Sequence, residues 1–260
     1  MILDLSTRAL ARHLETHTTI DSTNTRAKTL AASNAPHGTC VVAQAQTQGR
    51  GQRDRHWASP AGAGLYASFL LRPKLLPQQT PLLTLATAVA ACDAIKHVCG
   101  QQVGIKWPND LLARESKKKL AGILVEASSN AEKVNYAIIG IGINLKPEAF
   151  PTALREYAGA LEELSTTSVE PSALLSALAN ELEPWLDRLE NGASEPLIEA
   201  WRNRAIGRGQ TVEFVDDDRI IEGTLDGIAP SGGLIIAGQT YYSGELRLPG
   251  APQRPPDFEA

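Results

Sequence analysis

The sequence predicts an α+β fold in which a mixed β-sheet is flanked by helices and followed by a small β-rich C-terminal unit. In the first 206 residues, strand-length segments rich in β-branched residues alternate with longer segments of helical period. After Gly207 the texture changes to short stretches of alternating apolar and polar residues separated by turns. We therefore expect one large domain at 1–206, a small barrel at 207–248 and a disordered, proline-rich tail at 249–260.

The individual elements follow from local patterns. The segment up to Leu30 is expected to be helical, with a break at 16–23 where Asp21-Ser22-Thr23 can cap the second part. Apolar residues at helical spacing predict three further helices, at 80–99, 171–189 and 196–205. Apolar and β-branched runs predict strands at 39–45, 65–71, 103–107, 123–127 and 134–143. The C-terminal strands are expected at 211–215, 219–228, 233–237 and 239–242.

Composition excludes several classes of protein. Apolar residues make up 43% and charged residues 21%, which is typical of a globular chain. The net charge of −4 argues against a protein that coats nucleic acid. We expect no membrane span, because the strongly apolar runs look shorter than the ~20 residues that one needs. Three cysteines without a CxxC spacing indicate reduced thiols and a cytoplasmic location, and Cys92 and Cys99 fall on the apolar stripe of a predicted helix.

A loop at 49–57, with the sequence GRGQRDRHW, is the first candidate for chemistry. Its glycines allow the backbone to approach a ligand closely and to present N–H donors to an anion. Its arginines add fork-shaped cationic donors that suit a phosphate or a carboxylate. The loop is neither a Walker A motif nor a dinucleotide-binding GxGxxG motif. The same composition also fits a solvated surface loop.

Three more motifs lie at the ends of predicted strands. KWPND at 106–110 presents an amide and a carboxylate on a proline turn, although an ordinary turn has the same composition. KLAGI at 119–123 sets Lys119 immediately before a strand, where its ammonium could meet phosphate charge. GIGIN at 140–144 places two glycines inside an apolar strand, which indicates the close approach of a ligand or of another backbone.

Together with Asp21-Ser22-Thr23-Asn24, these motifs occur in the order typical of one family. In that order the chain resembles the biotin–protein ligases from Asp21 to Asn144, and its C-terminal unit resembles their SH3-like cap. The resemblance implies a catalytic domain like that of class II aminoacyl-tRNA synthetases. It also implies activation of biotin with ATP and Mg²⁺ to biotinyl-5′-AMP, and then transfer to a lysine of a biotin carboxyl carrier domain, as in acetyl-CoA carboxylase or another biotin-dependent enzyme. Because the first motif begins at Asp21, we expect the monofunctional type without a DNA-binding domain, and therefore no DNA partner.

The resemblance also implies roles for individual residues. Lys119 and Arg50 would relieve the repulsion between the biotin carboxylate and the α-phosphate. Asp110 matches a polar position around the adenylate, and because His56 is the only histidine in a motif, we expect Asp110 to orient or deprotonate the acceptor lysine. The residues implied to bind biotin are Ser22, Thr23, Asn24, Gln46, Arg50, Gly51, Gln52, Lys119, Gly122 and Gly140. Those implied to bind ATP or the adenylate are Arg53, Arg55, Trp57, Asn109, Gly142 and Asn144.

Two residues depart from the pattern of the family. Gln52 stands where some members have an arginine that helps to retain the adenylate, and Asp54 stands where a glycine is usual. We therefore expect this loop to hold the adenylate less tightly.

A lipoate–protein ligase would use the same chemistry, although the tryptophan of KWPND and the arginine-rich loop favour biotin. A non-catalytic biotin or nucleotide sensor should lack the reacting cations, whereas this chain has both Lys119 and Arg50. The sequence provides no ligand set for Mg²⁺, does not name the carrier protein and leaves a homodimer open.

Overall fold

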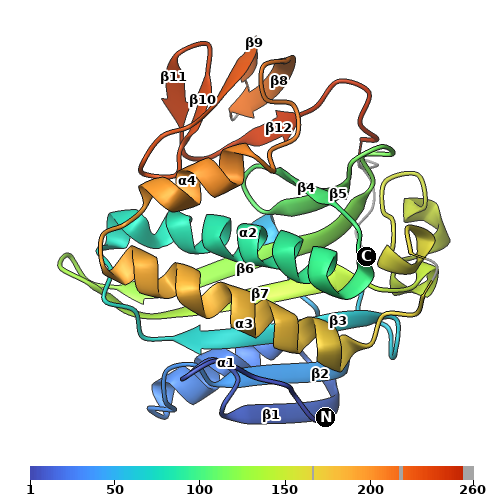
Figure 1. The fold of residues 1–260 in the computed structure, drawn as a ribbon, viewed down its shortest axis with the longest axis vertical. Coiled ribbons are helices and arrows are strands. Elements are labelled where there is room, and N and C mark those ends of the chain that lie inside the picture. Colours follow the sequence, from blue (N-terminus) through green and yellow to red (C-terminus); the bar gives the residue numbers. More distant parts are fainter. Residues whose placement is uncertain (166, 217–218, 254–260) are drawn as a thin grey trace.

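The computed structural model of the chain describes residues 1–165, 167–216 and 219–253, together with all of their side chains except that of Asp54 (Figure 1). It contains a mixed sheet with helices on both faces and a separate C-terminal β-sheet, so the expected fold class is confirmed. The expected boundary after residue 206 falls between the last helix and the first strand of the second sheet.

The large sheet has seven strands in the order β1-β2-β3-β7-β6-β5-β4. Its only parallel pair is β1 with β2, and every other neighbouring pair is antiparallel. Strands β3 and β7 are largely buried because helices cover both faces of the sheet. The strands are β1 (Leu14–Ile20), β2 (Cys40–Gln46), β3 (Gly64–Leu71), β4 (Val103–Lys106), β5 (Asp110–Ala113), β6 (Lys119–Ser129) and β7 (Val134–Asn144).

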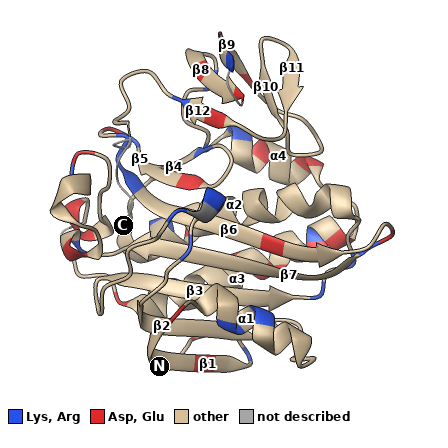
Figure 2. Ribbon diagram, turned by 180° about the vertical axis from the view of Figure 1, so that it is seen from behind, with Lys and Arg blue, Asp and Glu red and all other residues tan. Residues whose placement is uncertain are grey.

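The helices divide between the two faces of this sheet. The long helices α2 (Thr80–Cys99) and α3 (Pro171–Glu190) pack on each other and on one face, whereas α1 (Thr23–Ala32) packs on β2, β3 and β7 from the opposite face (Figures 1 and 2). Figure 2 shows that α1 covers only part of that second face. The expected helix cap at Ser22 is present, since its hydroxyl accepts a hydrogen bond from the Thr25 amide.

The apolar segment that contains α2 is longer than we expected from the sequence, where the apolar runs looked shorter than a membrane span. With the turn before it, the segment Pro77–Cys99 has 23 residues and a mean hydropathy of 1.5, so it meets the length and composition of a span. In the structure 67% of that window is buried between the sheet and α3, as in the core helix of a globular protein. Cys92 lies in this core as expected, and Cys99 is partly buried at its end.

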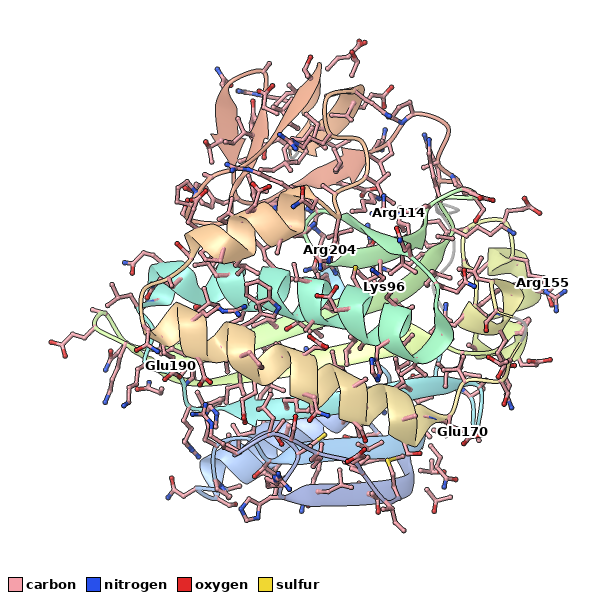
Figure 3. All side chains as sticks on the ribbon, in the orientation of Figure 1. Lys96, Arg114, Arg155, Glu170, Glu190 and Arg204 are labelled. Atoms are coloured by element: carbon pink, nitrogen blue, oxygen red, sulfur yellow. The ribbon has the colours of Figure 1, made fainter. Side chains whose placement is uncertain are left out.

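The C-terminal unit is a five-stranded antiparallel sheet that packs against the first domain. A short helix, α4 (Glu195–Arg202), leads into it, and Arg204 then pairs with Asp93 of α2 at 2.6 Å (Figure 3). Trp107 makes a second connection, because its indole N–H donates to the Gly232 carbonyl at 3.1 Å and its ring meets Phe214. The strand order is β11-β10-β9-β8-β12, with β8 (Thr211–Asp216), β9 (Arg219–Ile228), β10 (Leu234–Ile236), β11 (Gln239–Tyr241) and β12 (Glu245–Arg247).

Several local expectations differ from the structure. The expected first N-terminal helix is wrong, because residues 14–20 form β1; its threonines favour extended backbone, and its partner β2 lies 26 residues further along the chain. The sequence-based assignment also omitted β5 and β12, which are only four and three residues long and depend on their neighbours. The described part of the expected tail, 249–253, packs on the protein, with Lys117 donating to the Pro249 carbonyl and Ala251 on the core. The rest, 254–260, lies outside the described residues.

Glu183 of α3 anchors the N-terminal segment through its buried carboxylate. It accepts hydrogen bonds from the backbone amides of Arg8, Ala9 and Leu10 at 2.6, 2.8 and 2.9 Å. Burial favours the neutral acid, but these bonds and the Arg8 charge outweigh it and hold the pKa of Glu183 below its usual value. This carboxylate therefore stabilises the folded chain in its ionised form.

We expect Glu183→Ala to lower the free energy of unfolding by about 3 kcal/mol, because three amides lose a charged acceptor. Since the native pKa is lowered, this stabilisation is complete above the unfolded pKa and is lost as the pH falls through the native one. Urea titrations at pH 7 and at pH 3 measure both effects. Glu183→Gln keeps one acceptor oxygen and should lose less, and a variant as stable as the wild type at pH 7 would contradict the assignment.

Candidate active site

Three adjoining cavities lie on the α1 face of the sheet and at its junction with the C-terminal unit. The inner cavity, of about 50 Å³, lies against the central glycines of β6 and β7. The outer cavity, of about 110 Å³, lies between the 49–57 loop and the segment 149–158. The junction cavity, of about 120 Å³, lies between the 106–110 turn and β12. Gln52 and Asn109 line all three, so these cavities meet at one point.

The structure brings together every site residue that the sequence suggested. The inner cavity is lined by Ser22, Thr23, Asn24, Gln46, Arg50, Gly51, Gln52, Trp57, Asn109, Lys119, Gly122, Gly140 and Gly142. Asp110, Asn144 and Arg55 line the outer cavity, together with Gly51, Gln52, Trp57, Asn109 and Lys119. Arg53 lines the junction cavity with Arg55 and Asp110. The role of each residue stays a prediction.

A chain of hydrogen bonds holds the polar wall of the inner cavity. The Gln46 side-chain oxygen accepts from the Thr23 backbone amide at 2.8 Å, and its amide donates to Ser59 at 2.8 Å. The buried Ser68 hydroxyl lies 2.6 Å from the side-chain oxygen of Asn24 and donates to it. These contacts fix the orientation of the side-chain amides, so the wall presents a defined pattern of donors and acceptors.

Lys119 and Asp110 form an ion pair where the inner and outer cavities meet. Lys119 Nζ lies 2.6 Å from Asp110 Oδ1, and the two side chains are only 18% and 13% exposed. The same ammonium lies 5.4 Å from the centroid of the Trp57 ring. Lys119 is the first residue of β6 rather than the residue before the strand, and its backbone bonds Tyr157 and Gly159. The cation is therefore fixed by main-chain and side-chain contacts together.

The Trp57 indole packs against two cross-strand glycines. Gly122 of β6 and Gly142 of β7 are paired neighbours, and a Cβ atom at either position would lie 2.9 or 2.4 Å from the indole. Gly140 similarly makes room for Asn24, whose Oδ1 would lie 2.1 Å from an added Cβ. The two glycines of GIGIN thus admit the side chains of Asn24 and Trp57, and the expected contact between ligand and glycine backbone stays a prediction.

Asn109 and Asn144 use their amide groups to fix the backbone around Lys119. Asn109 donates to the carbonyl of Ile123 at 3.0 Å, and Asn144 donates to that of Gly159 at 3.0 Å. Both residues line the outer cavity. The indole N–H of Trp57 is buried and has no hydrogen-bond partner among the described residues.

The arginines of the 49–57 loop find different partners. Arg55 pairs with Glu245 of β12 at 3.5 Å, so the loop is connected to the C-terminal unit. Arg53 has a φ of +56°, an uncommon conformation for a residue with a side chain, and it is exposed. The sequence raised an Asp54 carboxylate near the phosphate-binding residues, but the Asp54 side chain lies outside the described part of the structure.

Sequence reasoning missed three contributions to the site. Phe150 and Tyr157 line the outer cavity from a segment without a motif, where only aromatic residues in a loop could have signalled them. Lys106 of KWPND lines the junction cavity, and burial lowers its pKa, although the Asp110 charge acts in the opposite direction. Glu126 of β6 lies behind the inner cavity, and its position on the inward face becomes evident only when β6 and α1 are assembled.

The described side chains form no cluster of metal ligands. They include no group of three or more His, Cys, Asp or Glu that could hold an ion. The nearby carboxylates already face cations, as Asp110 faces Lys119 and Glu245 faces Arg55. The described residues therefore do not fit a protein-held Mg²⁺ site, and we assign no step of the reaction to one.

The comparisons with known proteins agree with this geometry. Residues 17–144 match the biotin/lipoate A/B protein ligase family. The chain is 37% identical over 251 residues to the bifunctional ligase/repressor BirA of Bacillus subtilis, covering 94% of this chain and 76% of that protein. It is 33% identical over 225 residues to the biotin–[acetyl-CoA-carboxylase] ligase of Paracoccus denitrificans, covering 84% of this chain and 91% of that protein.

A solved structure shows the same fold. The biotin protein ligase of Aquifex aeolicus in complex with biotin and ATP superimposes with a TM-score of 0.77 at 28% identity, over 90% of this chain and 97% of that chain. The sheet, the helices and the three adjoining cavities thus belong to a ligase. The chain is a member of the biotin/lipoate A/B protein ligase family.

Proposed function

We propose that this ligase activates biotin with ATP to biotinyl-5′-AMP and then transfers the biotinyl group to a lysine of a biotin carboxyl carrier domain. The observation that carries the proposal is the position of Lys119, which lines both the inner and the outer cavity. Biotin in the inner cavity and the adenosine of ATP in the outer cavity would bring the carboxylate and the α-phosphate together beside this ammonium. Relatives that are named as biotin ligases support the same activity.

In the first step a biotin carboxylate oxygen bonds to the α-phosphorus, and the bond from that phosphorus to the β-phosphate bridging oxygen breaks. Two anions meet, and negative charge grows on the phosphoryl oxygens. Lys119 and Arg50 are fixed cations around that position, since both line the inner cavity and both are held by carboxylates. They stabilise the developing charge without having to reorganise.

In the second step the acceptor lysine attacks the biotinyl carbonyl carbon, and AMP leaves with the bonding electron pair. The amine must be neutral to attack and must lose a second proton afterwards. Asp110 lines the outer and junction cavities beside Lys119, and we assign it the orientation of the incoming amine. Any Mg²⁺ would enter with the phosphates of ATP, because such ions keep several waters and few protein ligands.

The proposed partners are therefore biotin, ATP and a carrier domain that presents one exposed lysine. We propose a cytoplasmic location, which the three free cysteines and the use of ATP support. We propose no DNA partner, since the chain carries a net charge of −4. A homodimer rests on no observed contact, and sedimentation of the purified chain measures that state directly.

Pyrophosphate release tests the proposed function against the alternatives. The purified chain is incubated with ATP and either biotin, lipoate or neither acid. We expect release with biotin alone, followed by labelling of a carrier domain. Release only with lipoate would identify a lipoate ligase on the same catalytic plan. Tight biotin binding without release would identify a sensor, and either result overturns the proposal.

Gln52 lines all three cavities and adds no positive charge to the loop over them. We expect Gln52→Arg to slow the dissociation of biotinyl-5′-AMP by about 10-fold, the effect of one charge-assisted hydrogen bond of ~1.4 kcal/mol. The measurement is the off-rate of preformed adenylate by rapid dilution. Gln52→Met, which has a similar length and no charge, is the control, and an unchanged off-rate in Gln52→Arg refutes the expectation.

A further inference from the structure

We infer that Glu126 is a positioning residue for biotin. It does not line the inner cavity itself, but it holds Arg50 and Asn24, which do. The inference rests on the proposed function. Glu126 lies on β6 two residues beyond the cavity-lining Leu124, so its side chain points to the same face of the sheet. There it meets the first turns of α1 and the beginning of the 49–57 loop.

The Glu126 carboxylate joins three separate parts of the chain. Its Oε1 accepts from Lys28 Nζ at 2.5 Å and from Arg50 Nη1 at 3.0 Å. Its Oε2 accepts from Asn24 Nδ2 at 2.9 Å and lies 3.2 Å from Arg50 Nη1. This carboxylate thus connects strand β6 to helix α1 and to the 49–57 loop. Two of its partners, Asn24 and Arg50, line the inner cavity.

The charges at this point require the carboxylate. Lys28 and Arg50 approach the same Glu126 oxygen, so removing its charge would leave two cations facing each other. The Glu126 side chain is 19% exposed, and solvent therefore screens that repulsion only in part. Burial opposes ionisation, but the hydrogen bonds from Lys28 and Asn24 and the two nearby cations outweigh it and lower the pKa of Glu126. Glu126 is therefore ionised at neutral pH.

The same contacts determine what Asn24 presents to the inner cavity. Because its amide nitrogen donates to Glu126, its side-chain oxygen turns toward the Ser68 hydroxyl and lies against Gly140. Without the carboxylate, the Asn24 amide is free to rotate and Arg50 is free to leave. The outer cavity has none of these three residues in its lining. Loss of Glu126 should therefore weaken biotin binding and leave nucleotide binding intact.

Calorimetry with biotin alone and with ATP alone tests this selectivity. We expect Glu126→Gln, which keeps the shape and removes the charge, to raise the Kd of biotin about 10- to 100-fold, by analogy with substitution of a residue that orients a metal ligand. The Kd of ATP should change less than twofold. In the Arg50→Met background the effect of Glu126→Gln should shrink, because one of its two routes to biotin is already lost.

The matched control is Glu15→Gln. Glu15 of β1 bonds Arg26 of the same helix α1 at 2.6 Å and is 29% exposed, but neither residue lines the inner, outer or junction cavity. We expect its biotin Kd to match that of the wild type. Equal weakening by both glutamine variants, weakening of ATP binding to the same extent, or an undiminished effect in the Arg50→Met background would each overturn the inference. A wild-type chain that releases no pyrophosphate with biotin would instead overturn the proposed function.

Discussion

Lys119→Ala should lower biotin-dependent pyrophosphate release by a factor on the order of 10²–10³, the effect of removing one preorganised charge-stabilising group. Its ammonium is fixed by Asp110 at 2.6 Å and by the backbone contacts of its strand. No other lysine lines both the inner and the outer cavity among the described residues. A single-turnover assay with saturating biotin and ATP separates the chemical step from binding.

The neighbouring Lys118 provides the control. It is one residue away and donates to the Arg155 carbonyl, outside the three cavities. We expect Lys118→Ala to retain wild-type turnover within about twofold, since substitutions on the surface, away from buried contacts, usually have small effects. A Lys119→Ala enzyme as fast as the wild type would remove Lys119 from the chemistry and would leave Arg50 as the cation to examine.

Gly142→Ala should lower the same rate by about 10²-fold, because a displacement of roughly 1 Å at a binding group is enough for such a loss. The new methyl group would lie 2.4 Å from the Trp57 indole nitrogen, and the strand cannot yield because Gly142 is paired with β3 and β6. Trp57 must therefore move, and it lines both the inner and the outer cavity.

A second substitution distinguishes this displacement from general unfolding. In Gly142→Ala/Trp57→Phe the smaller ring leaves space for the methyl group, so activity should recover to the level of Trp57→Phe alone. Gly223→Ala is the control for crowding at another glycine, since in the C-terminal sheet its added Cβ would lie 3.0 Å from both Ala237 and Ile236. If Gly142→Ala has wild-type activity, or if the double variant is slower than both single variants, Trp57 is not placed by this glycine.

Local patterns were sufficient wherever one element contains its own signal. The 20 residues of α2 carry an uninterrupted apolar period and end at Gly100, whose φ of +69° suits a glycine cap, and the expected bounds of 80–99 match. The strand assignment failed at β1, because a threonine-rich segment becomes a strand only by pairing with β2. Strand pairing is a long-range interaction, and periodicity within a short window does not contain it.

The candidate site divides in the same way. The sequence by itself determined the chemistry, because the order of the motifs from Asp21 to Asn144 provided the cations, the amides and the glycines of an adenylating ligase. Only the tertiary structure decided that Lys119 pairs with Asp110, that Trp57 covers two glycines and that Glu126 holds Arg50 and Asn24. These five pairs of residues are 9, 65, 85, 76 and 102 residues apart in the chain. The sheet register and the path of one loop bring them within contact distance, and neither is written in any local pattern.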